Sequence, residues 1–72
     1  MKYLTDGQRH LVCYPYSVAR LHEMAESLGI GRHFFHNGTH YDIPQKRVKE
    51  IEDKCEIVST RDIVRVIKGK EL

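Results

Sequence analysis

The chain has 72 residues, which is enough for one small domain and leaves no room for a second core. Twelve basic and ten acidic residues give a net charge of +2, a weak excess for a nucleic-acid-binding protein. No apolar run approaches the roughly 20 residues of a membrane-spanning helix, and the first residues lack the apolar core of a signal peptide. We therefore expect a cytoplasmic protein with no membrane partner. Because so small a domain buries limited surface, we also expect a homo-oligomer.

The chain contains only two cysteines, Cys13 and Cys55. They lack the spacing of a zinc site and are too few for a disulfide framework, which fits a reducing compartment. Cys13 falls in an expected core strand, and both cysteines are interpreted as small buried hydrophobic residues.

Strands and helices alternate along the predicted fold. Short apolar runs predict strands over residues 1–5, 11–14, 33–36 and 56–59, with an extended segment over 41–43. Asp6-Gly7 is a turn signal, and Asn37-Gly38 predicts a loop or hairpin. This order favours an α/β class, with α+β as the alternative, in a small single-domain sandwich with about three helices against one short sheet.

Apolar residues recur at helical spacing over residues 18–28, 44–53 and 60–68. Ser17 is a good N-cap for the first of these helices, and Gly29 supplies its C-terminal stop. Pro44 suits the first position of the second. Ser59 or Thr60 caps the third. The apolar side of the third helix is expected to consist of Ile63, Val64, Val66 and Ile67.

Histidine accounts for five residues, and the segment 36–42 carries the most chemically versatile group. His36, His40 and Asp42 are candidate ligands of a divalent metal, although the favoured interpretation is a site that holds no metal. They also suit a general acid–base pair in which Asp42 fixes a histidine tautomer. The structural alternative is that His40 and Tyr41 pack the loop and Asp42 stabilises the start of the next helix.

Basic residues flank this segment. Arg32 precedes it, and Lys46 and Arg47 follow it in the expected first turn of the helix over 44–53. Cations at a helix start are unfavourable unless an anion binds there, and free backbone N–H groups also favour an anion. Since arginine binds phosphate through paired donors, a phosphate-bearing ligand is predicted. The alternative is a solvated surface.

Two further histidines have a predictable setting. If the first two strands pair, Asp6 and His10 lie near the same end of the sheet, where His10 either joins a site or points to solvent. His22 lies at the edge of the apolar stripe of the first helix, where packing or a partner contact is favoured over a ligand role.

The sequence resembles a family of small phage and bacterial proteins catalogued as domain of unknown function 4031. The matching features are Leu21-His22, Ala25, Leu28-Gly29, Phe35-His36, His40-Tyr41-Asp42-Ile43 and Arg47. Tyr3, Asp6, His10-Leu11 and the segment 58–63 also resemble the family. One departure is Thr5-Asp6, where longer members carry two consecutive acids, which argues against a metal site built on paired carboxylates.

The resemblance implies that one region contains Asp6, His10, His36, His40, Tyr41, Asp42 and Arg47, and the short chain looks like the phage-encoded members. Together with Arg32 and Lys46, these residues are the predicted ligand-binding set. The favoured hypothesis is a phage-type protein that binds a phosphate-bearing small molecule, namely a nucleotide, and sequesters a host defence signal in the host cytoplasm. One alternative is a metal-dependent phosphoesterase or nuclease. The other is an inhibitor of a host protein.

Overall fold

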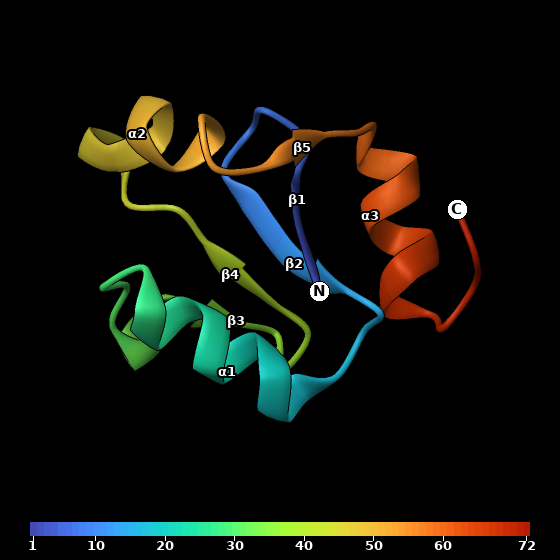
Figure 1. The fold of residues 1–72 in the computed structure, drawn as a ribbon. Coiled ribbons are helices and arrows are strands. Elements are labelled where there is room, and N and C mark those ends of the chain that lie inside the picture. Colours follow the sequence, from blue (N-terminus) through green and yellow to red (C-terminus); the bar gives the residue numbers. More distant parts are fainter.

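A five-stranded mixed sheet forms the centre of the computed structural model, which describes residues 1–72 (Figure 1). The strands are β1 (Lys2–Thr5), β2 (His10–Tyr14), β3 (Phe35–His36), β4 (His40–Asp42) and β5 (Glu56–Ile57). Their order across the sheet is β3-β4-β2-β1-β5, and every neighbouring pair is antiparallel except β1 and β5, which run parallel. This arrangement, with three helices, confirms the predicted α/β class.

The three helices are α1 (Val18–Ser27), α2 (Val48–Glu52) and α3 (Thr60–Ile67). As predicted, the Ser17 side chain caps α1, accepting a hydrogen bond from the backbone N–H of Arg20. Gly29 follows α1 with a φ of +72°, a conformation that side chains with a Cβ rarely adopt. Ser59 and Asp62 form a capping box at the start of α3. None of the helices is long and apolar enough to cross a membrane.

The two faces of the sheet carry separate cores, because successive side chains of a strand point to opposite faces. In β2, Leu11 and Cys13 belong to the larger core, which α1 and α2 cover. Val12 belongs to the smaller core, where it packs with Leu4 of β1 and with α3. Figure 1 shows α1 and α3 on opposite sides of the sheet.

The helix α3 covers only part of its face. Its buried residues Ile63 and Val66 pack on β1 and β2, whereas β4 and β3 lie on the far side of β2. The face of β4 and β3 on the α3 side therefore carries no helix. Side chains that project there from β4, β3 and the near end of β2 are available to a ligand.

The expected helix over 44–53 is wrong in its extent. Pro44 has an extended ψ of 132°, residues Gln45–Arg47 form a 3₁₀ turn, and only Val48–Glu52 is α-helical. The break occurs at Arg47, whose φ of −113° and ψ of 5° lie outside the helical region. The five-residue α2 is thus anchored by tertiary packing of Ile51, which is fully buried, and not by its own length.

Two expectations about shorter features also need correction. Residues Arg32–Phe34 form a 3₁₀ turn, closed by the Phe34 N–H on the Gly31 carbonyl, so only the second half of the expected strand over 33–36 exists. Val64 was expected on the apolar side of the last helix but is 43% exposed. The buried positions Ile63 and Val66 are three residues apart, which turns Val64 toward solvent.

Candidate metal centre

Four chemically versatile side chains share the uncovered part of the sheet face. His10 lies two residues from Val12, which packs beneath α3, so both project to the same face. Tyr41 belongs to the opposite core, so its neighbours His40 and Asp42 project to the α3 side. The remaining member is His36, which pairs with His40 across the β3–β4 hairpin, as His10 pairs with Asp42 across β2 and β4.

The β3–β4 hairpin depends on its turn chemistry. Asn37 and Gly38 have φ angles of 53° and 65°, a left-handed pair that Asn-Gly adopts readily. The Thr39 hydroxyl oxygen lies 2.9 Å from Nδ1 of His40. With Nδ1 engaged, Nε2 of His40 faces Asp42. The turn therefore sets both the register and the ring orientation of His40.

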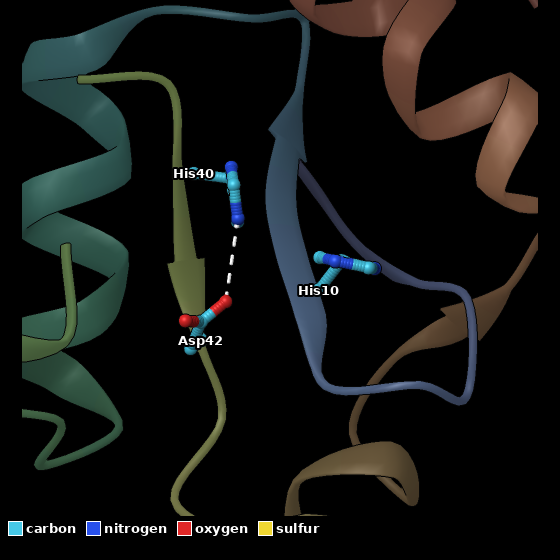
Figure 2. Close-up of side chains that lie close together, drawn as sticks. All are labelled: His10, His40 and Asp42. Atoms are coloured by element: carbon cyan, nitrogen blue, oxygen red, sulfur yellow. Dashed lines mark ion pairs between the residues drawn. The ribbon is translucent and has the colours of Figure 1, made fainter. Parts of the chain in front are cut away.

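His10, His40 and Asp42 offer three ligand atoms that all lie within 4.8 Å of one another. Figure 2 shows His40 and Asp42 on β4 and His10 on the neighbouring β2. Nε2 of His40 is 3.3 Å from Oδ1 of Asp42. Ligand bonds of 2.0–2.2 Å in a tetrahedral site place neighbouring ligands about 3.4 Å apart, so this pair already has the required separation.

His10 is held from behind by Asp6. Nδ1 of His10 lies 2.6 Å from Oδ2 of Asp6, and the Asp6 side chain is 0% exposed. The same Oδ2 accepts a 2.7 Å hydrogen bond from the hydroxyl of Thr60, at the start of α3. Burial is the largest influence on the pKa of Asp6 and raises it, but hydrogen bonds from Thr60 and His10 outweigh it, and the net pKa is lowered. Asp6 therefore stays ionised, and its Oδ2 presents an acceptor to Nδ1 of His10.

His40 is the most enclosed of the three histidines in the group, with a side chain only 12% exposed. Burial is the main influence on its pKa and lowers it, because the cationic form loses solvation. Asp42 raises the pKa again, but the net result remains below the usual value. At neutral pH His40 is therefore a neutral imidazole, the form that binds metal ions.

Two residues of the predicted ligand-binding set lie away from this group. The ring of Tyr41 is 1% exposed in the core on the opposite face, where its hydroxyl meets Nδ1 of His22 at 2.6 Å, so it has no free face on which to stack a base. Arg47 donates to the carbonyls of Leu28 and Gly29 and to the carboxylate of Glu50, and so secures the end of α1.

The other two predicted cations also stand apart. Arg32 and Lys46 are exposed in the 3₁₀ turns before β3 and α2, and neither forms a hydrogen bond or ion pair with the histidine group. The structure therefore brings together Asp6, His10, His36, His40 and Asp42 but not the basic half of the predicted set. The expected packing role of His22 is confirmed, since its ring contacts Phe35 and Tyr41 edge-on.

The site also contains two threonines that the sequence did not single out as site residues. No signal in the sequence pointed to Thr39, because a threonine next to a histidine is ordinary in a turn. Thr60 lies 54 residues from Asp6 in the chain, so only the packing of α3 beside the β1–β2 turn brings them together. Both cysteines are free, and both pack in the core on the opposite face, so neither joins the group. Burial raises the pKa of the Cys55 thiol to about 11.

Comparisons with known proteins give one family. No curated protein and no solved structure matches the chain. A family model described as "Protein of unknown function (DUF4031)" matches residues 6–70, and this span contains the whole group from Asp6 to Thr60. The match covers nearly all of the chain, which therefore belongs to the DUF4031 family, as the resemblance of its His40-Tyr41-Asp42 segment implied.

Proposed function

We propose that the protein binds a divalent transition-metal ion through His10, His40 and Asp42 and uses it to hydrolyse a phosphoester. The observation that carries this proposal is the convergence of two imidazole nitrogens and one carboxylate oxygen within 4.8 Å. These side chains come from two strands, at positions 10, 40 and 42, and all stand on an uncovered part of one sheet face.

The donor set favours one class of ion. Two imidazoles and one carboxylate suit zinc, manganese, iron or cobalt, whereas magnesium and calcium prefer oxygen ligands only. Both histidines present Nε2, because Nδ1 of His10 meets Asp6 and Nδ1 of His40 meets Thr39. Such outer contacts are usual behind metal-binding histidines and fix their orientation.

Three protein ligands leave coordination positions free, which is typical of catalytic rather than structural sites. An ion held there would supply a nucleophilic water at neutral pH and stabilise negative charge on a phosphoryl oxygen. His36, which is 57% exposed and has Nδ1 4.0 Å from Oδ2 of Asp42, stands at the rim. Its place there suits contact with a substrate or its leaving group.

Arg9 supports an anionic substrate. It directly precedes His10, and its Nε donates to the carbonyl of Ile43, the residue after Asp42, at 2.7 Å. The side chain forms no ion pair with a carboxylate, so its two terminal nitrogens remain available to an anion. Paired guanidinium donors are a common means of binding a phosphoryl group.

The test uses untagged, metal-stripped protein, because a histidine tag would bind the same ions. We expect zinc, cobalt or manganese to bind with one ion per chain by calorimetry and native mass spectrometry. The loaded protein should hydrolyse bis(p-nitrophenyl) phosphate or p-nitrophenyl phosphate, which separates diesterase from monoesterase activity. The absence of stoichiometric binding, or a bound ion with no turnover of any phosphoester, would refute the proposal.

The nucleotide hypothesis is distinguished in the same assay. Nucleotide binding without catalysis should raise the melting temperature of the metal-stripped protein. Under our proposal, nucleotides raise it only after the ion is added. A shift of equal size in the stripped protein would favour sequestration over hydrolysis.

Metal affinity should also depend on pH. His10 and His40 must be neutral to bind, so protons compete with the ion as the pH falls below the imidazole range, near 6.5 for a free group. Because the pKa of His40 is lowered, this histidine stays neutral to lower pH than a free imidazole. We expect the affinity to fall progressively as the pH is lowered from 8 to 5, because the ion must displace each proton that binds a ligand imidazole. Calorimetry at pH 8, 7, 6 and 5 measures it, and affinity that rises on acidification would instead indicate anion binding by imidazolium groups.

A further inference from the structure

The structure assigns Asp6 and Thr60 a role as positioning residues: Thr60 holds the Asp6 carboxylate, which fixes the tautomer and direction of His10 so that Nε2 faces His40 and Asp42. This inference deepens the proposed function, on which it rests for the ligand role of His10. It goes further because it links α3 to the site: the side chains of Thr60 and Asp6 connect the start of this helix to His10.

Both oxygens of the Asp6 carboxylate have specific polar partners. Oδ1 receives the backbone N–H of Gln8 at 2.8 Å, which closes the turn after β1. Oδ2 receives the Thr60 hydroxyl at 2.7 Å and meets Nδ1 of His10 at 2.6 Å. Since the side chain is 0% exposed, water does not compete for these positions. The carboxylate has one place for His10, and that place requires a proton on Nδ1.

The consequence for His10 is a single neutral tautomer. With the proton on Nδ1, the lone pair is on Nε2, the atom that a metal ion needs. The His10 ring lies 5.2 Å from the His40 ring, centroid to centroid, with the planes at 71°. Without Asp6, the proton would be shared between both nitrogens and the ring would lose its fixed direction. A carboxylate behind a metal-binding histidine also raises its basicity as a ligand.

Thr60 belongs to a different element from Asp6 and His10, so its contact with Asp6 is more than part of a local turn. Thr60 is the first residue of α3, and Ser59 and Asp62 cap that helix independently of Asp6. The Thr60 hydroxyl is therefore not needed for capping and is free to contact Asp6. The helix that covers β1 and β2 thus also supplies the outermost group of the histidine site.

The first experiment needs no metal. Long-range ¹H–¹⁵N correlation spectra of the metal-free protein at pH 8 report which nitrogen of His10 is protonated. We expect the Nδ1–H form in the wild type and a shift toward the Nε2–H form in Asp6→Asn, whose amide NH2 would donate to Nδ1. Asparagine keeps the size of the side chain and can still accept the Gln8 N–H, which preserves the turn. A wild-type His10 protonated on Nε2 would overturn the inference, whether or not the protein binds metal.

The second experiment measures zinc affinity by calorimetry. We expect Asp6→Asn to weaken binding about 10- to 100-fold, as is usual for outer contacts of metal ligands, and Thr60→Val to weaken it by less than about tenfold. Asp53→Asn is the control, since it removes an equal charge from an exposed residue outside the site. Unchanged affinity in Asp6→Asn overturns the inference. A wild type that binds none of zinc, cobalt and manganese refutes the proposed function instead, and the tautomer spectra then decide the role of Asp6 alone.

Discussion

Replacement of His40 by alanine is expected to reduce metal affinity more than any other single change in the protein. His40 is the central member of the group, with Nε2 3.3 Å from Asp42 and its ring 5.2 Å from that of His10. Loss of a direct ligand should exceed the 10- to 100-fold effect of an outer contact, so we expect a decrease of more than about 100-fold. Hydrolysis of the phosphoester should be lost with it.

The measurement is calorimetry with zinc and manganese, together with thermal unfolding with and without the ion. At an ion concentration 100 times the wild-type Kd, binding stabilises the wild type by about 2.7 kcal/mol, and this gain should fall to about 0.4 kcal/mol or less in His40→Ala. His33→Ala is the matched control, because His33 is exposed and its ring contacts Phe34 outside the site. If both variants bind the ion as the wild type does, the metal centre is not at His40.

The largest effect on stability is expected from Leu21→Ala in α1. Leu21 is 0% exposed and belongs to the larger core. A buried leucine replaced by alanine costs about 2–5 kcal/mol, through lost burial and the cavity that remains. A domain of 72 residues has a free energy of unfolding of only about 4–11 kcal/mol at roughly 0.05–0.15 kcal/mol per residue, so this change removes a large share of it. Alanine favours helix at least as well as leucine, so packing alone accounts for the loss.

Thermal or urea unfolding of the metal-free protein measures this effect. The melting temperature should fall by about 10 °C or more, given roughly 4–8 °C per kcal/mol for a domain of this size. Val64→Ala provides the control, since Val64 is 43% exposed on α3 and its loss should change stability by less than about 0.5 kcal/mol. Equal losses of stability in the two variants would contradict the presence of Leu21 in the larger core that α1 covers.

The sequence predicted those parts of the fold that depend on neighbouring residues. Ser17 and Gly29 mark the ends of α1 because capping acts within a few residues. Asn37-Gly38 marks the β3–β4 turn for the same reason. The second helix was predicted too long because a side chain within the expected range, that of Arg47, contacts residues distant in the chain. Arg47 reaches the carbonyls of Leu28 and Gly29, and the backbone at Arg47 departs from helical angles.

The candidate site was predictable in part. The His40-Tyr41-Asp42 segment and the placement of Asp6 and His10 near one end of the sheet were predicted from the sequence, and alternation along β4 explains why Tyr41 points away from its neighbours. The meeting of His10 with His40 depends on the placement of β4 beside β2, which joins distant segments. The contact of Thr60 with Asp6 depends likewise on the packing of α3, which no local pattern encodes.

The parallel pairing of β1 with β5 has a consequence for the order of folding. It joins Leu4 with Glu56, so it must close a loop of about fifty residues, whereas the β1–β2 and β3–β4 hairpins close short ones. Loop-closure entropy rises with length, and distant contacts therefore tend to form late. The hairpins that carry His10, His40 and Asp42 should form before α3 follows β5 into place. His10 would then meet His40 and Asp42 through the β2–β4 pairing, which closes about thirty residues, and Thr60, 54 residues from Asp6, would reach it in the last stage of folding.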